Sequence, residues 1–288
     1  MTDDSFVPAA PPYAPAWIEL EGIANARDTG GLPTIDGRTT RSGVLLRSAN
    51  LQRATPGDVR TLVEDLGLGT VLDLRTDAER HLEGPTVFAE KVRHRELTLI
   101  PHNRGESDAD EVDRVIDQAV PVHPKGPDSP VSRDKWQFTP DDPNDMSGPY
   151  LGYVRDLPEN LAETLRVIAD PASGPVLVHC AAGKDRTGTV VALALSLAGV
   201  TREAVVADYA ASAERIGDVL KSLQGSRTYG DDLADITVDA IMPKASSMER
   251  FLDTVDAEYG GVHGLAMSLG VDEETVARLA ARLVGTSR

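Results

Sequence analysis

The sequence predicts an α/β fold in which helices flank a central, mainly parallel β-sheet. Two observations lead to this fold class. Short apolar segments of strand character alternate with helical patterns along the chain. The chain also has 288 residues, 41% of them hydrophobic, which is enough to bury a sizeable core. We expect a single domain over 19–288 after a flexible, proline-rich tail over 1–18, and no internal repeat.

Four segments have the composition of strands, at 43–47, 70–75, 96–100 and 176–178. Helices are expected between and after them, where apolar residues recur three and four positions apart. These helical faces are formed by Val59, Leu62, Val63 and Leu66; by Leu161, Leu165 and Ile168; by Met248, Phe251, Leu252 and Val255; and by Val276, Leu279 and Leu283. Start signals stand at Thr55, Thr201 and Asp272. Residues 25–31 are polar and glycine-rich, so we expect a turn there.

The strongest functional signal lies between the fourth strand and an apolar helix over 190–197. The segment 179–188 has the sequence His-Cys-Ala-Ala-Gly-Lys-Asp-Arg-Thr-Gly and contains Cys180, the chain's only cysteine, with Arg186 six positions later. A strand that ends at a glycine-containing turn and continues as a helix directs backbone N–H groups and a positive dipole end toward one point. Such a loop suits a phosphate dianion, which the amides and the guanidinium would bind together.

Eight of these ten positions match the signature His-Cys-x-x-Gly-Lys-Asp-Arg-Thr-Gly. A match by chance has a probability on the order of 10⁻⁸ at average residue frequencies. A lone cysteine is usually a buried core residue, but that interpretation leaves Gly183, Lys184 and Arg186 unexplained. We therefore predict that Cys180 is a nucleophile, since the helix N-terminus and nearby cations favour its thiolate.

The remaining residues of the loop have expected roles in the same chemistry. The phosphate-binding residues are expected to be Ala181, Ala182, Gly183, Lys184, Asp185 and Arg186. Lys184 either adds a cation above the phosphate or is solvated on a turn. Thr187 is expected to hydrogen-bond the sulfur of Cys180, to cap the helix, or both. His179 is expected to orient the loop through its ring nitrogens rather than to carry protons.

Composition limits the class of partner. The formal net charge of −17 argues against nucleic acid and anionic membranes as partners. A single cysteine excludes an intrachain disulfide and is consistent with a reducing compartment. The sequence has no run of eighteen apolar residues, so stable membrane insertion is not expected. The acidic, proline-rich start lacks the regions of a signal peptide, so we expect a cytoplasmic protein or one secreted without a classical signal peptide.

Residues 102–149 differ in character from the rest, being rich in Asp, Pro, Ser and Gly with one helical patch at 112–120. A segment of this length without a strong core pattern is typical of a functional lid or of a disordered segment. We expect a partly ordered lid near the reactive loop, with a plain insertion as the alternative.

The chain resembles the atypical, lipid-active bacterial tyrosine/serine protein phosphatases from about residue 19 to residue 283. Besides the signature loop, the resemblance is carried by Asn25-Ala26-Arg27-Asp28, Leu46-Arg47-Ser48, Asp73-Leu74-Arg75, Ala207-Asp208-Tyr209 and Glu258-Tyr259-Gly260-Gly261. It implies a protein-tyrosine-phosphatase-like fold with a helical lid, no metal and no cofactor. It also implies phosphorylated protein or phosphoinositide substrates, with inorganic phosphate as a product.

The chain departs from this family in the loop after the third strand. Where the family tends to carry an aspartate, residues 100–103 read Ile-Pro-His-Asn. The leaving oxygen still needs a proton, so Asp185 in the loop is the expected general acid. Alternatively, Asp185 braces the loop or pairs with Arg27 or Arg47. Further candidates for the acid are His102, Asp108 and Asp110.

A second acidic and basic group, formed by Asp73, Arg75, Asp77 and Glu79, is expected to be structural. Asp73 and Arg75 end a strand and are expected to form internal ion pairs, with Glu79 in the following turn. The leading functional hypothesis is thus a cysteine-dependent phosphomonoester hydrolase that forms a phosphocysteine. The alternative is a phosphate-binding signalling module with little turnover. Arsenate reduction is disfavoured because the chain has no second cysteine.

Overall fold

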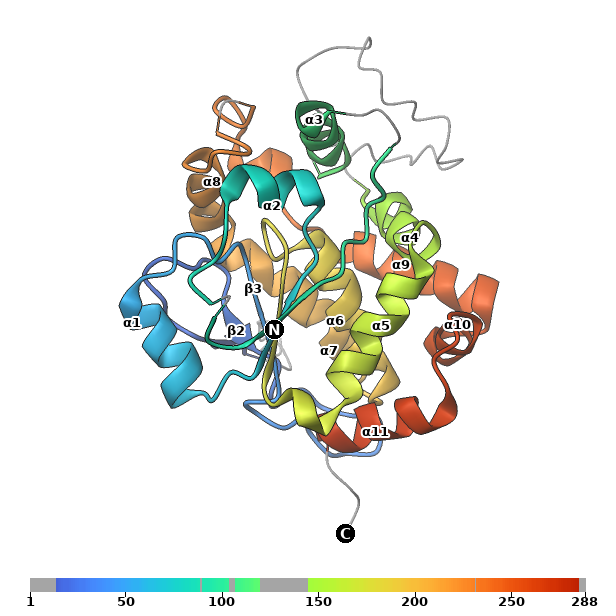
Figure 1. The fold of residues 1–288 in the computed structure, drawn as a ribbon. Helices are drawn as coiled ribbons and strands as arrows, with labels where there is room; N and C mark the ends of the chain where they lie inside the picture. The colour runs from blue at the N-terminus through green and yellow to red at the C-terminus, as the bar shows by residue number, and fades with distance from the viewer. Residues whose placement is uncertain (1–13, 89, 104–106, 120–144, 231, 285–288) are drawn as a thin grey trace, which may run out of the picture.

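The computed structural model describes residues 14–88, 90–103, 107–119, 145–230 and 232–284 (Figure 1). Its sheet has six strands in the order β1-β2-β3-β6-β4-β5. They are β1 (Ala16–Trp17), β2 (Arg27–Asp28), β3 (Leu45–Ser48), β4 (Thr70–Asp73), β5 (Arg93–Glu96) and β6 (Val176–His179). The neighbours β3, β6, β4 and β5 pair in parallel, whereas β1 and β2 pair antiparallel. The predicted α/β fold class with a mainly parallel sheet is confirmed.

Helices cover both faces of the sheet (Figure 1). They are α1 (Pro56–Val59), α2 (Asp77–Glu83), α3 (Asp108–Ala119), α4 (Ser147–Arg155), α5 (Pro158–Ala169), α6 (Asp185–Leu197), α7 (Arg202–Ala210), α8 (Ile216–Gln224), α9 (Ala245–Tyr259), α10 (Val262–Ser268) and α11 (Glu273–Val284). A π-helical segment, Arg60–Asp65, continues α1, and 3-10 turns cover Pro171–Ser173, Ala211–Arg215 and Val238–Ile241.

The sheet separates two apolar cores because successive side chains of a strand point to opposite faces. In β6, Val176 and Val178 pack into the larger core with α4–α7 and α9, whereas Leu177 packs into the smaller one beneath α1. Strand β6 is therefore central and covered on both faces. The segment that follows it, at the carboxyl end of the parallel strands, lies where ligands bind in open α/β sheets.

Local capping confirms the predicted helix starts. The hydroxyl of Thr55 accepts a hydrogen bond from the Asp58 amide, and the hydroxyl of Thr201 accepts one from the Ala204 amide. Asp272 likewise accepts a hydrogen bond from the amide of Thr275, ahead of α11. Each interaction satisfies an N–H group that has no partner inside its helix.

Three predicted boundaries were wrong. The third strand is Arg93–Glu96 rather than 96–100, because it pairs in register with β4 at the sheet edge although it contains no apolar residue. The expected polar turn at 25–31 contains β2, and Ala16–Trp17 of the expected tail forms β1 against it. Short edge strands that are paired through the backbone show little hydrophobic patterning, so the hydrophobic pattern does not predict them.

Part of the expected insertion lies outside the described residues, as do residues 1–13 of the tail. The helical patch within it is confirmed as α3, and the next described segment contains α4. Among the helices that are described, none is long and apolar enough to cross a membrane.

Candidate active site

The signature loop connects β6 to α6 and is held against the end of β3. The amide of Asn50 donates to the carbonyl of Ala181 at 2.9 Å. Gly183 has a φ of 65°, and a Cβ built on it would lie 2.2 Å from the carbonyl oxygen of Ser48. Only glycine combines that backbone conformation with so close an approach. Gly183 therefore allows the loop to pass this close to the end of β3.

One cavity contains most of the predicted loop residues. Its volume is about 50 Å³. From the loop it is lined by Cys180, Ala181, Ala182, Lys184, Asp185 and Arg186; from elsewhere by Val115, Tyr153, Ile216, Leu223, Tyr229, Leu233 and Ile241. Cys180 is 2% exposed, and the residues that line the cavity with it are mainly apolar. Val115 belongs to α3, so the predicted insertion contributes to this wall.

Arg186 is held by a residue that sequence reasoning assigned no role at the site. Its Nη1 donates to Oε2 of Glu79 at 2.6 Å and its Nη2 to Oε1 at 2.9 Å. Burial opposes the charge of Arg186, but the carboxylate of Glu79 and then Cys180 outweigh burial and raise the pKa of Arg186 well above its ordinary value. Glu79 lies in α2 rather than in the expected turn, where it also accepts from the Thr76 amide in a capping box. The Thr-x-x-Glu spacing is typical of such a cap, but no local pattern indicates that Glu79 binds Arg186.

A tyrosine completes this arrangement. The hydroxyl of Tyr229, which lines the cavity, donates to Oε1 of Glu79. Burial raises the pKa of Glu79, but Arg186 and then Tyr229 outweigh it, so the net pKa is lowered and Glu79 is ionised. Glu79 thus connects the cavity wall to the guanidinium that faces the cavity.

Lys184 is neither solvated nor free to move above the loop. It is 3% exposed, and its Nζ donates to the carbonyl of Ile241 at 2.8 Å. The same nitrogen lies 3.5 Å from Oδ2 of Asp185. The solvated alternative is wrong, because the cation is fixed at the cavity wall.

Asp185 begins α6 and lies in the cavity wall. Its Oδ1 accepts a hydrogen bond from the Tyr150 hydroxyl at 2.7 Å. The alternative in which Asp185 pairs with Arg27 or Arg47 is wrong. Both arginines instead bind Asp208, at 3.0 Å and 2.5 Å, and are fully buried.

Asp208 supports the loop from behind through these arginines. Burial raises the pKa of Asp208, but Arg27 and then Arg47 outweigh burial, so its pKa is lowered. Arg47 also donates to the carbonyl of Gly183 at 2.8 Å. Asn25 donates to the same carbonyl at 3.1 Å. The family motifs around Arg27, Arg47 and Asp208 are therefore loop supports and not phosphate ligands.

His179 and Thr187 lie behind the cavity. Nδ1 of His179 lies 3.1 Å from the carbonyl of Cys180, and because a carbonyl only accepts, Nδ1 carries the hydrogen. Burial lowers the pKa of His179 to about 4, so the ring is neutral, as expected of an orienting residue. Thr187 lies inside α6 rather than at its N-cap. Its buried hydroxyl has no hydrogen-bond partner among the described residues.

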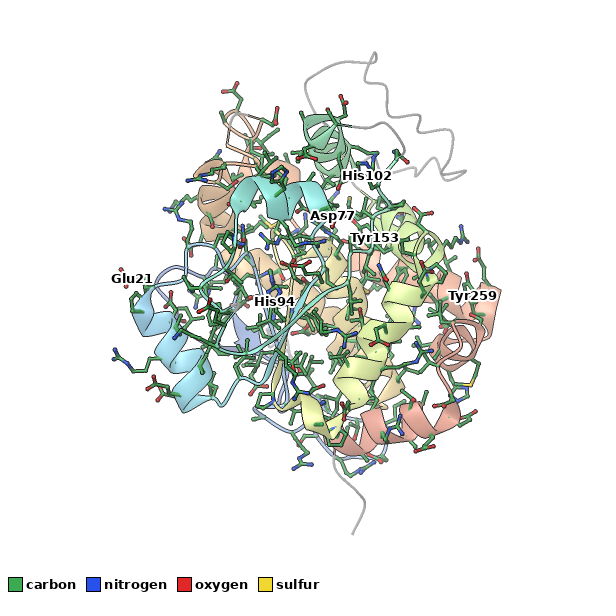
Figure 2. All side chains as sticks on the ribbon, in the orientation of Figure 1. Glu21, Asp77, His94, His102, Tyr153 and Tyr259 are labelled. Carbon is green, nitrogen blue, oxygen red and sulfur yellow. The ribbon has the colours of Figure 1, made fainter. Side chains whose placement is uncertain are left out.

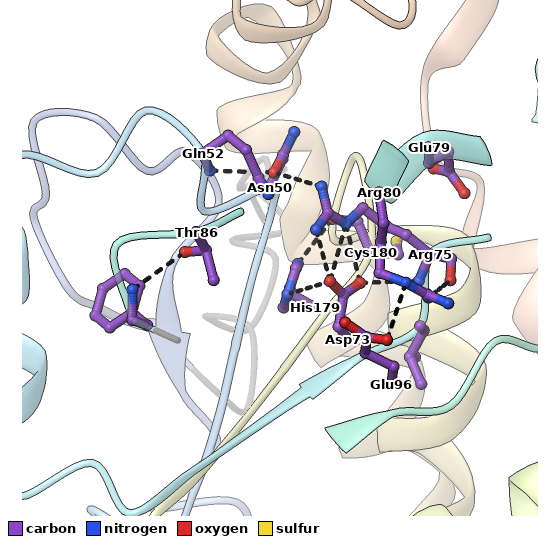
Figure 3. A network of polar contacts seen from close by, with 12 residues as sticks. Asn50, Gln52, Asp73, Arg75, Glu79, Arg80, Thr86, Glu96, His179 and Cys180 are labelled. Carbon is purple, nitrogen blue, oxygen red and sulfur yellow. Dashed lines mark hydrogen bonds and ion pairs between the residues drawn. The ribbon is translucent and has the colours of Figure 1, made fainter. Parts of the chain in front are cut away.

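Asp73 and Arg75 form the predicted internal ion pair (Figure 3), with Nη2 of Arg75 2.6 Å from Oδ2 of Asp73. Ligand atoms of Asp73, His94 and His179 lie within 4.8 Å of one another, the one such cluster among the described residues that has metal-binding donors. However, Arg75 already donates to both oxygens of Asp73. The carboxylate charge is therefore compensated, and the cluster is a poor fit for a cation.

The other acid candidates lie outside the residues that line this cavity. His102 contacts the buried Glu111 through Nδ1, and Asp108 lies 2.6 Å from Nδ1 of His81. Asp110 accepts from the hydroxyl of Ser107 at the start of α3. Figure 2 shows His102 beside α3 and Tyr153 in the neighbouring α4.

Comparisons with known proteins show the family to which the chain belongs. Residues 18–285 match the tyrosine phosphatase family. The chain is 29% identical to the triple specificity protein phosphatase PtpB of Mycobacterium tuberculosis, over 93% of this chain and 99% of that protein. It is 25% identical to a tyrosine-protein phosphatase of Nostoc commune, over 96% and 87% of the two chains. The P. aeruginosa TpbA structure with phosphotyrosine is a distant likeness, with a TM-score of 0.33, 17% identity and 82% and 91% coverage. The chain is therefore a hydrolase of the tyrosine phosphatase family.

Proposed function

We propose that this protein hydrolyses phosphotyrosine through a phosphocysteine formed on Cys180. The observation that carries the proposal is the convergence of Cys180, Asp185 and Arg186 on one enclosed cavity at the N-terminus of α6. A nucleophile, a carboxyl group and a fixed guanidinium are the groups that phosphoryl transfer needs in one place.

In the first step, Cys180 Sγ forms a bond to phosphorus while the ester P–O bond breaks. The leaving oxygen takes a proton from Asp185. In the second step, water attacks phosphorus, the S–P bond breaks and inorganic phosphate leaves. Asp185 then recovers its proton from the attacking water. The same carboxyl group thus acts first as an acid and then as a base.

Arg186 and the loop amides stabilise the equatorial oxygens in both steps. The hydrogen bonds to Glu79 use Nη1 and Nη2, and the Nε–H of Arg186 has no partner within the described part of the chain. Nη1 also donates to the carbonyl of Leu74 at 3.2 Å, so the Nε–H and one hydrogen of Nη2 are available to the phosphate. The buried hydroxyl of Thr187 has no hydrogen-bond partner among the described residues, and we assign it the role of donor to the sulfur of Cys180 when the S–P bond breaks.

The enclosure favours an aromatic phosphate ester over an inositol phosphate. Apart from Lys184 and Arg186, no basic side chain lines the described cavity, and Arg27 and Arg47 are bound to Asp208. An inositol phosphate with several anionic groups would need more cations there. The M. tuberculosis relative is named a triple specificity phosphatase, so phosphoserine/threonine and phosphoinositides are the comparison substrates.

The test measures turnover of a phosphotyrosine peptide, a phosphoserine peptide and a phosphoinositide side by side. We expect the phosphotyrosine peptide to have the highest kcat/KM. Cys180→Ser is expected to abolish turnover while inorganic phosphate still raises the thermal unfolding midpoint. Residual turnover near that of the parent in Cys180→Ser would exclude the phosphocysteine. Phosphate binding without turnover in the parent protein would instead favour a phosphate-binding signalling module.

A further inference from the structure

Two buried tyrosines connect the candidate acid to the core of the protein. Tyr150 in α4 and Tyr209 in α7 are 0% and 1% exposed. The two hydroxyl oxygens lie 2.7 Å apart, and the Tyr150 hydroxyl also donates to Oδ1 of Asp185 at 2.7 Å. Their rings meet edge to face, with centroids 6.0 Å apart. Neither tyrosine lines the cavity that contains Cys180.

The direction of these hydrogen bonds follows from counting donors and acceptors. If Tyr150 donated to Tyr209, the hydroxyl hydrogen of Tyr209 would have no acceptor among the described residues. If Tyr209 donates to Tyr150 and Tyr150 donates to Asp185, both hydrogens are used. Burial, and then the negative charge of Asp185, raises the pKa of Tyr150 well above its ordinary value, so Tyr150 remains a donor.

We propose that Tyr150 is a positioning residue that holds Oδ1 of Asp185 as a permanent acceptor, so that Oδ2 carries the proton used in catalysis. Tyr209 acts behind it by fixing the direction in which Tyr150 donates. Oδ2 is the oxygen nearer to Lys184, whose Nζ is 3.5 Å away at the cavity wall. A carboxyl group held at one oxygen cannot rotate its proton away from the leaving group. This proposal rests on the acid role proposed for Asp185.

Leaving-group dependence is the decisive measurement, because a good leaving group departs with little help from an acid. We compare kcat/KM for a series of substituted aryl phosphates in the parent, Tyr150→Phe, Asp185→Asn and the double variant. Tyr150→Phe keeps the buried ring. With phenyl phosphate, its kcat/KM is expected to fall about tenfold, which is a fraction of the full contribution of a general acid. With para-nitrophenyl phosphate, its kcat/KM is expected to fall less than about twofold.

The pH profile gives an independent readout. A hydrogen bond donated to the ionised carboxyl favours that form, so its removal favours the protonated acid. The descending limb of kcat/KM in Tyr150→Phe is therefore expected at higher pH than in the parent. Tyr259→Phe, at the end of α9 and outside the cavity lining, is the matched control and is expected to change neither measurement.

The outcomes separate the two proposals. If Asp185→Asn retains the parent's leaving-group dependence, the acid role of Asp185 is wrong. If Asp185→Asn steepens the leaving-group dependence but Tyr150→Phe lowers kcat/KM equally for all substrates, or for none, the positioning role is overturned and the acid role stands. In the Asp185→Asn background, Tyr150→Phe is expected to add no further leaving-group dependence. Should Tyr150→Phe not fold, Tyr209→Phe must give a weaker effect of the same selective kind, and a uniform loss there would overturn the proposal.

Discussion

Arg186 and Glu79 form a two-point ion pair in which each terminal nitrogen of the guanidinium meets its own carboxylate oxygen, at 2.6 and 2.9 Å. Both residues are nearly inaccessible to solvent, at 5% and 0% exposure. The pair orients the guanidinium before any substrate arrives. Glu79 therefore determines whether the guanidinium of Arg186 is oriented to bind a phosphate.

Glu79→Gln is expected to lower the free energy of unfolding by about 3 kcal/mol, because it leaves the buried charge of Arg186 uncompensated. Inorganic phosphate can restore an anion beside Arg186, so phosphate should raise the unfolding midpoint more in the variant than in the parent. Thermal unfolding with and without phosphate measures both effects. Glu258→Gln, which removes an exposed partner of Arg155, is the control and should change stability by less than about 1 kcal/mol. Equal stability of Glu79→Gln and the parent would contradict this account.

Asp208→Asn is expected to destabilise the protein by about 3–5 kcal/mol, because Arg27 and Arg47 would share no buried anion. Phosphate affinity should also fall, since Arg47 donates to the carbonyl of Gly183. Urea unfolding and phosphate titration measure the two losses. The exposed pair of Asp36 with Arg38 supplies the control Asp36→Asn, for which a change near zero is expected. A similarly small change in Asp208→Asn would show that the two arginines need no partner.

Gly183→Ala is expected to abolish turnover and phosphate binding, since the added Cβ meets the Ser48 carbonyl at 2.2 Å. Gly37→Ala is a matched control at φ 82°, where no atom lies within 4 Å of the added Cβ. It should cost about 1 kcal/mol of backbone strain and leave activity unchanged. Phosphate-dependent shifts of the unfolding midpoint distinguish the two variants. Normal phosphate binding in Gly183→Ala would contradict the close approach of the loop to β3.

Stability is expected to fall as the pH drops from about 6.5 to about 4, because burial lowers the pKa of His179 to about 4. In this window the unfolded chain binds a proton that the folded protein does not. One such group changes the free energy of unfolding by up to about 1.4 kcal/mol per pH unit. Urea unfolding at pH 7, 6 and 5 measures the slope. His179→Asn should reduce it, whereas His263→Asn, at an exposed site, should not. An unchanged slope in His179→Asn would show that other groups cause the pH dependence of stability.

The sequence alone determined the reactive loop and the class of fold. The types and spacing of the residues from His179 to Gly188 indicate the chemistry of the loop. The apolar content of the segments on either side indicates the strand β6 and the helix α6. These properties are local, because turn chemistry, capping and periodicity depend on neighbours within a few positions. The same local rules identified the caps of Thr55, Thr201 and Asp272. They failed for β5, whose residues Arg93–Glu96 are a strand only because β4 lies beside them.

Only the tertiary structure decided which side chains serve the loop. Glu79 reaches Arg186 across 107 positions, and Asp208 reaches Arg47 across 161. Both pairings depend on how α2 and α7 pack around the sheet, and no local pattern records that. The same packing turned Arg27 and Arg47 away from the cavity and placed Tyr150 against Asp185. A buried charge needs a partner wherever the fold can bring one, so these partners are a property of the packed core rather than of the motif.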